Sequence, residues 1–154
     1  MLQEIKRKGN RPRGGHFAIV ASQYNARYVN AMLRAAQAEF RQAGATVKIV
    51  RVPGAYEIPL VTQRLARAGG PGLSGIVCLG VILRGQTVHA EHIGREVSRA
   101  LMDIQLRQEI PVIHEVLLLE NEEQARARCL GGKFNRGMEA AQTALAMARV
   151  MRGL

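Results

Sequence analysis

The stretch GVILRGQTVHAEH, Gly80–His92, passes from an apolar run through a glycine turn to a histidine at the start of a helix. Together with residues 76–79, the apolar run predicts a buried strand of a parallel sheet. Apolar residues then recur at helical spacing from Ile93 to Ile104. A helix that begins after a glycine turn directs backbone N–H groups at one point, which suits a phosphate. Because His89 lies beside that point and histidine transfers protons near neutral pH, the segment predicts proton transfer on a phosphorylated small molecule.

The same alternation of strand and helix continues along the chain. Further strands are predicted at residues 17–21, 47–52 and 112–119, and helices around residues 29–40, 58–68 and 138–151. A short helix follows Asn121, which has the side chain of an N-cap and precedes two glutamates. The pattern predicts an α/β fold, a three-layer α/β/α sandwich with a four-stranded parallel sheet.

Polar segments follow three of the predicted strands, at residues 22–25, 53–57 and 85–89, and His114 lies within the fourth strand. Ligands of open parallel sheets bind beyond the carboxyl ends of the strands. We therefore expect these segments to converge on one edge of the sheet and to form a single site.

The composition indicates one domain with a basic extension. The chain has 154 residues, 47% of them hydrophobic, and a net charge of +10. Part of that charge lies in residues 1–15, which also contain Pro12 and several glycines, so we expect a flexible basic arm at 1–15 and a single domain at 16–154. The arm could contact nucleic acid, but a solvated tail or a subunit-packing strand is the favoured interpretation.

The compartment expected for this composition is the cytoplasm. No apolar run approaches the ~20 residues of a membrane span, and the first residues lack the apolar centre of a signal peptide. Cys78 and Cys129 form no CxxC or Cys/His pattern, which favours two buried, reduced thiols. His89, Glu91 and His92 form an HxEH-like cluster, but no third ligand is evident, so the sequence predicts no metal site.

Several motifs together resemble the 6,7-dimethyl-8-ribityllumazine synthase family, and the likeness runs from about Phe17 to the C-terminus. The matching pieces are YN at 24–25, VPGAYEIP at 52–59, GVILRGQTVH at 80–89, PVI at 111–113, the EQAxxR run at 123–128 and NRGMEAA at 135–141. The resemblance implies a flavodoxin-like strand order and an enzyme that condenses 5-amino-6-ribitylaminouracil with 3,4-dihydroxy-2-butanone 4-phosphate. It further implies no metal or organic cofactor, a pentamer that in some members assembles into a sixty-subunit capsid, and riboflavin synthase as a partner. In this family the active site lies between adjacent subunits of the pentamer.

The resemblance also assigns roles at the phosphate end of the site. His89 corresponds to the general acid–base histidine, with a helix N-cap or first-turn histidine as the alternative. Gly85, Gln86 and Thr87 would hold the phosphate, or else form only a strand-to-helix turn. Arg128 corresponds to the phosphate-binding arginine, with a solvated surface residue as the alternative. Arg136 stands where many relatives carry lysine, which keeps the charge and alters the reach.

A second group of residues would bind the pyrimidine and its ribityl chain. Tyr24 occupies an aromatic stacking position, with core packing as the alternative, and Glu57 would accept hydrogen bonds from ribityl hydroxyls or act only as a first-turn helix charge. The expected binding set is completed by Asn25, Gly54, Ala55, Tyr56, Val81, Ile82 and Leu83, mainly through their backbone groups.

The chain departs from the family pattern at three places. His114 replaces a phenylalanine that the neighbouring subunit contributes, Leu118-Leu119-Glu120 replaces a polar segment, and the loop around Lys133 differs from common patterns. A non-catalytic flavin- or lumazine-binding shell protein on the same fold is an alternative, since a fold alone does not fix function. A basic RNA-binding domain fits less well, because the sequence offers no aromatic stacking platform.

Overall fold

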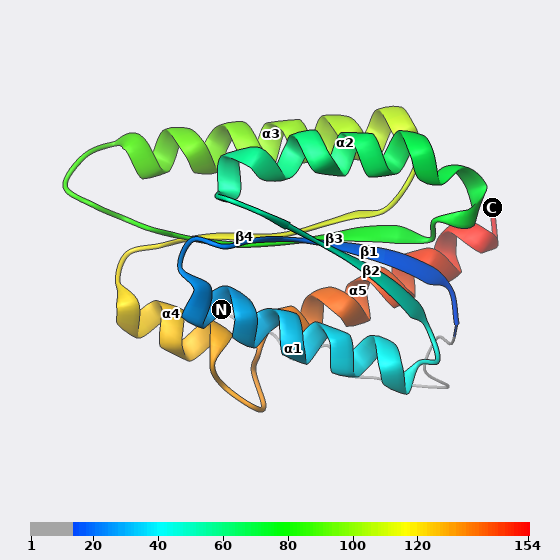
Figure 1. Cartoon of the computed structure of the whole chain (residues 1–154), viewed down its shortest axis with the longest axis horizontal. Coiled ribbons are helices and arrows are strands. Elements are labelled where there is room, and N and C mark those ends of the chain that lie inside the picture. Colours follow the sequence, from blue (N-terminus) through cyan, green and yellow to red (C-terminus); the bar gives the residue numbers. More distant parts are fainter. Residues whose placement is uncertain (1–13) are drawn as a thin grey trace.

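Four parallel strands form one sheet in the order β2-β1-β3-β4 (Figure 1). The structure is a computed structural model that describes residues 14–154. The strands are β1 (His16–Ser22), β2 (Thr46–Val52), β3 (Gly75–Leu83) and β4 (Val112–Leu119). This arrangement confirms the predicted four-stranded parallel sheet and its flavodoxin-like order.

Helices cover both faces of the sheet, which confirms the three-layer sandwich (Figure 1). One layer consists of α2 (Ile58–Gly69) and α3 (His89–Gln108), and the other of α1 (Ala26–Gln42), α4 (Glu122–Cys129) and α5 (Arg136–Arg152). Two short 3-10 helices, η1 (Ala55–Glu57) and η2 (Gly70–Gly72), flank α2. Within residues 14–154 no helix has the length and apolar character that a membrane crossing requires.

The predicted basic arm at 1–15 falls almost entirely outside the described residues. Its last two residues, Gly14 and Gly15, are described and are bonded to the domain. The Gly14 N–H donates to the Ala43 carbonyl at 2.7 Å, and the Gly15 carbonyl accepts from the Thr46 N–H at 3.0 Å. The described chain is therefore already attached to the domain two residues before β1 begins.

The central strand β3 explains the apolar run from which the fold was predicted. It pairs with β1 on one side and β4 on the other, and its residues from Gly75 to Ile82 are buried. Val77 and Leu79 pack toward α1 and α5, whereas Ile76 and Cys78 pack toward α2 and α3. Cys78 and Cys129 are both buried and free, as predicted.

The strands β1, β3 and β4 end at different levels, and this difference positions the site. The pairing of β1 with β3 ends at Ala21 and Leu79, but the pairing of β3 with β4 continues to Leu83 and Leu119. In the described sheet, residues 80–83 of β3 therefore have no strand partner on the β1 side. A short length of main chain is left there for other partners.

Candidate active site

A cleft of about 990 Å³ lies at the carboxyl ends of β1, β2 and β3, between η1 and the first turns of α3. It brings together most of the residues that the sequence assigned to the site, although they come from three separate segments. Those in its lining are Tyr24, Asn25, Gly54, Ala55, Tyr56, Glu57, Val81, Ile82, Leu83, Gly85, Thr87 and His89. Gln86 belongs to the same exposed turn between Gly85 and Thr87. The predicted convergence on one edge of the sheet is thus present.

The segment after β1 is fixed to the free end of β3 by a side chain. Asn25 precedes α1 in the left-handed conformation, with φ of 55°, which asparagine tolerates better than most residues. Its Nδ2 donates to the Val81 carbonyl at 2.7 Å. The adjacent Tyr24 is 75% exposed, so core packing of its ring is wrong. The ring instead stands at the cleft, where a heterocycle could stack on it.

The segment after β2 forms η1, and Glu57 has a structural contact there. Its Oε2 accepts from the Gly54 N–H at 2.9 Å, which stabilises the turn. The carboxylate remains exposed and lines the cleft. Because a carboxylate offers about four lone-pair positions, this contact leaves acceptors for hydroxyl groups of a ligand.

The turn after β3 leads directly into the N-terminus of α3. Val88 is the N-cap residue, and its side chain makes no capping hydrogen bond. The histidine is therefore the first helical residue and not the cap. Its N–H donates to Thr87 Oγ1 at 3.4 Å, a long contact. The uncapped N–H groups, the Thr87 hydroxyl and the helix dipole together suit an anion.

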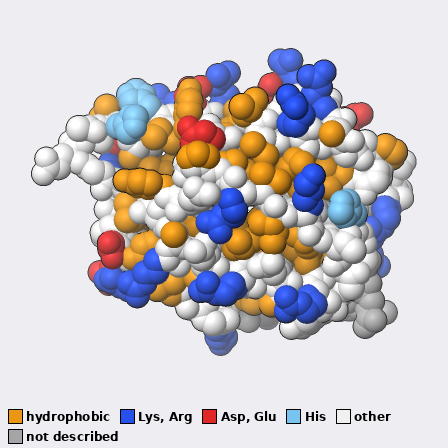
Figure 2. Space-filling view, in the orientation of Figure 1, with side chains coloured by type: hydrophobic (Ala, Val, Ile, Leu, Met, Phe, Trp, Pro, Cys, Tyr) orange, Lys and Arg blue, Asp and Glu red, His pale blue; other side chains and the backbone are white. Residues whose placement is uncertain are grey.

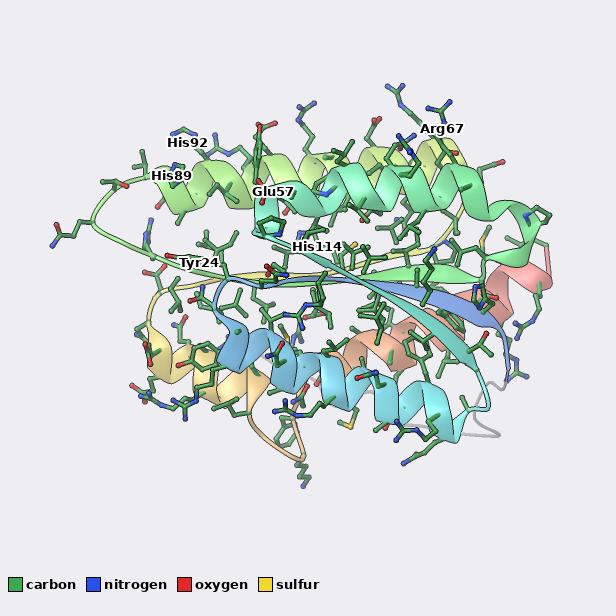
Figure 3. All side chains as sticks on the ribbon, in the orientation of Figure 1. Tyr24, Glu57, Arg67, His89, His92 and His114 are labelled. Carbon is green, nitrogen blue, oxygen red and sulfur yellow. The ribbon has the colours of Figure 1, made fainter. Side chains whose placement is uncertain are left out.

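One face of α3 contributes residues that the sequence analysis did not assign to the site. His92, Ile93 and Glu96 line the cleft in addition to His89. These three positions follow His89 by three, four and seven residues, as expected for one helical face. Helical spacing counted from the histidine would have identified them. Figure 3 shows His89 and His92 at the start of α3 with Glu57 at the start of α2, and Figure 2 shows histidines at this end bordering hydrophobic side chains.

The cleft of a single chain is lined by acidic and uncharged side chains and by histidines. Among the described residues its lining contains no lysine or arginine, whereas Glu57 and Glu96 are present. No group of three or more His, Cys, Asp or Glu residues in 14–154 lies close enough to hold a metal ion. Glu91, from the HxEH-like cluster, forms an ion pair with Arg84 instead. A phosphate bound here would meet backbone N–H groups but no cationic lysine or arginine from the same chain.

His114 lies on β4, outside the cleft, on the side of the sheet that α2 and α3 cover (Figure 3). Its Nδ1 accepts from the Val116 N–H at 3.3 Å, so its proton is on Nε2, which lies 2.7 Å from Ser98 Oγ. Ser98 Oγ in turn donates to the Gly94 carbonyl at 2.8 Å. Burial lowers the pKa of His114. These contacts hold a neutral imidazole in a fixed orientation.

Arg128 and Arg136 also lie away from the cleft of their own chain, in the layer of α4 and α5. Arg128 is half-buried near the end of α4. The Nε of Arg136 contacts Glu115 Oε1 at 2.7 Å, and its Nη1 contacts Glu139 Oε2 at 2.9 Å. Burial raises the pKa of Glu115 to about 6, although Arg136 opposes the shift. The guanidinium of Arg136 therefore forms ion pairs with two neighbouring carboxylates of its own chain.

Comparison with known proteins agrees with the motifs. The model of the 6,7-dimethyl-8-ribityllumazine synthase family matches residues 14–152. A protein named 6,7-dimethyl-8-ribityllumazine synthase from Xanthomonas euvesicatoria pv. vesicatoria is 38% identical over 144 residues, 92% of each chain. Another of that name from Stenotrophomonas maltophilia is 38% identical over 146 residues, 93% of each chain. The chain belongs to the 6,7-dimethyl-8-ribityllumazine synthase family.

Proposed function

We propose that the protein condenses 5-amino-6-(D-ribitylamino)uracil with 3,4-dihydroxy-2-butanone 4-phosphate to give 6,7-dimethyl-8-ribityllumazine, phosphate and water. This is the penultimate step of riboflavin biosynthesis, and we place it in the cytoplasm. The observation that carries the proposal is the cleft itself. It joins the uncapped start of α3, where His89 lies, to an exposed tyrosine and a free main-chain edge.

The two ends of the cleft suit the two substrates. The turn at residues 85–87 offers backbone N–H groups and a hydroxyl to the phosphate of the butanone. At the other end, Tyr24 offers a ring face to the pyrimidine, and the main chain of residues 81–83 offers hydrogen-bonding groups to its edge. Glu57 lies where it can accept from ribityl hydroxyls. Substrates held in this way are brought together, which alone removes much of the barrier to a bimolecular reaction.

In this scheme His89 moves protons through the successive steps. The 5-amino group attacks the ketone carbon, and the histidine donates a proton to the departing water as the C=N bond forms. Abstraction of a proton from the carbon chain then expels the phosphate, which keeps the electron pair of the C–O bond. Closure of the second C–N bond, with loss of water, completes the ring. The turn that binds the phosphate would stabilise its negative charge as it leaves.

A second copy of the chain would supply the missing cation. The cleft of one chain, as described, has no lysine or arginine in its lining, yet it must bind a phosphate. We propose that Arg128 and His114 of a neighbouring subunit complete the site within a pentamer, and that pentamers can assemble into a capsid of sixty subunits. Met102, Leu106 and Leu118 are exposed on α3 and β4 and would be covered by such contacts. Riboflavin synthase, which uses the product, is the proposed partner enzyme.

The direct test is to mix the purified protein with both substrates and follow the absorbance of the lumazine. We expect turnover that depends on both substrates and persists in the presence of a metal chelator. A control variant is Arg149→Ala, which removes an exposed arginine from the end of α5, away from the cleft. Absence of product above the uncatalysed rate, with folded protein, would refute the proposed activity.

A further inference from the structure

Arg84 is the residue through which the turn at residues 85–87 is attached to the rest of the fold. Its N–H donates to the Leu119 carbonyl at 2.8 Å, at the end of β4. Its Nη1 donates to both carboxylate oxygens of Glu120, at 2.9 and 3.1 Å. Its Nη2 forms an ion pair with Glu91 in the first turn of α3. One side chain thus joins the end of β4 to the beginning of α3.

The turn has few other contacts that could fix its shape. Residues 85–89 are all exposed. A Cβ atom at Gly85 would meet no heavy atom within 4 Å among the described residues, so nothing packs against the turn at that point. The bond from the His89 N–H to Thr87 Oγ1 is long, at 3.4 Å. The geometry of the turn therefore depends on its two ends, and the Arg84–Glu91 pair connects them.

The same ion pairs also determine the charge beside the turn. Glu91 and Glu120 would place two negative charges near a bound phosphate and repel it. Arg84 pairs with both of them, and neither it nor its two partners is in the lining of the cleft. Because its guanidinium is already shared by two carboxylates, it is not available as a phosphate ligand.

We propose that Arg84 is a positioning residue: by clamping Glu91 and Glu120 it holds the turn open for a phosphate monoester and offsets part of the negative charge beside it. The inference rests on the proposed function, since it deepens the role of the turn as the site of the butanone phosphate. Glu120 belongs to the segment that departs from the family pattern, so this clamp depends on a feature of this particular chain.

The test compares Arg84→Gln, Glu120→Gln and Arg84→Lys with the wild type in steady-state kinetics. Partly exposed ion pairs are individually weak, so we expect Arg84→Gln to raise the KM for the butanone phosphate roughly three- to tenfold. The KM for the pyrimidine should stay unchanged. Glu120→Gln retains the Arg84–Glu91 pair and removes one of the two negative charges, so it should show a smaller rise, and Arg84→Lys should recover part of the loss. The control is Arg107→Gln, which breaks the exposed pair with Asp103 at the far end of α3 and should change neither KM.

Binding of inorganic phosphate, measured by calorimetry, separates this inference from the proposed activity. If the wild type makes no lumazine, weaker phosphate binding by Arg84→Gln and Glu120→Gln than by Arg107→Gln still supports the clamp. An unchanged KM and unchanged phosphate affinity in folded Arg84→Gln would overturn it. Equal increases in both KM values would also overturn it, because they indicate a general structural role. If Arg84→Gln does not fold, Glu120→Gln decides by the same criteria.

Discussion

The layer of α1 and α5 and the cleft at the carboxyl ends of the strands are built in opposite ways. Where α5 meets α1, Gly137 approaches so closely that an added Cβ would lie 2.0 Å from the Met32 carbonyl oxygen. The buried face of α5 continues with small side chains: Ala140, Ala141, Ala144 and Ala148. At the cleft, by contrast, Tyr24 and Tyr56 are 75% and 63% exposed. The first region is complete within one chain, whereas the second presents surfaces that only a ligand or another chain would cover.

This difference predicts that substitutions in the two regions will have separable effects. Changes in the packed layer should lower the free energy of unfolding and leave the KM values of the surviving enzyme unchanged. Changes in the cleft should alter rate or affinity with little effect on unfolding, because exposed side chains contribute little to the stability of the core.

The largest effect is expected for Gly137→Ala. The new methyl group would clash with backbone of α1, which cannot move as a side chain can, so the helices must separate. Overpacking of this kind costs up to about 3 kcal/mol, measurable by denaturant unfolding. Gly94→Ala is the control, because its Cβ would make an ordinary contact at 3.6 Å with Leu118, and alanine favours the middle of a helix. Equal stability of the two variants would contradict the account of this layer.

His89→Ala should give the next largest effect, on turnover alone. General acid–base catalysis contributes ~10²–10⁴-fold, and the low end is expected because amines and ketones condense without a catalyst. Pyrimidine affinity and the free energy of unfolding should be close to those of the wild type, since the side chain is exposed. An unchanged turnover number in steady-state kinetics would remove the histidine from the mechanism.

Glu115→Gln tests the packed region through the pH dependence of the free energy of unfolding. Burial raises the pKa of Glu115 from 4.5 to about 6, so the folded state favours the neutral form. The neutral carboxyl of Glu115 therefore contributes its full stabilisation of the folded state below the unfolded pKa. This contribution is lost as the pH rises through about 6. Between about pH 4 and pH 8 this amounts to about 2 kcal/mol. Since glutamine does not ionise, the variant should lose that much less stability over the range, as measured by denaturant unfolding at each pH. Parallel pH profiles for the two proteins would exclude the effect.

His114→Phe should give the smallest effect, with the opposite pH dependence. Burial lowers the pKa of His114, so the fold favours the neutral ring. Its contribution is present above the unfolded pKa of about 6.5 and is lost as the pH falls through the lower folded value. Thermal melting of the wild type should therefore decline more between about pH 7.5 and pH 5 than melting of the phenylalanine variant. A steeper decline in the variant would contradict the neutral, Nε2-protonated ring.

The sequence was most informative where chemistry and local pattern coincide. The apolar run of β3 predicted its burial, which extends from Gly75 to Ile82, and the polar segments after three strands predicted the cleft. Contacts between distant segments were not predictable in this way. The bond from Asn25 to Val81 joins residues 56 positions apart, and the pair of Arg84 with Glu120 depends on the end of another strand. No local periodicity encodes such partners, because they are set by the register of the sheet.

A local sequence pattern also could not predict roles that depend on a partner side chain or a neighbouring subunit. Arg136 was assigned to substrate from its motif, but in the structure it pairs with Glu115 and Glu139. Glu57 was assigned either to the ribityl chain or to a helix charge, and its bond to Gly54 shows a structural contact that does not exclude the first role. The assignments of Arg128, Arg136 and His114 stay predictions, since all three lie outside the cleft of their own chain.

The most direct test of the claim that the cleft is one half of a shared site is complementation between two inactive variants. One variant carries Tyr24→Ala and His89→Ala, which damage the cleft, and the other carries Arg128→Ala and His114→Ala, which damage the half supplied to the neighbour. Each alone should be nearly inactive. In randomly mixed oligomers, roughly a quarter of the head-to-tail interfaces would pair two intact halves. Lumazine formation by the purified, co-expressed mixture should therefore return to about a quarter of the wild-type rate. If mixed oligomers form and remain as inactive as either parent, the site is contained within one chain and the account is wrong.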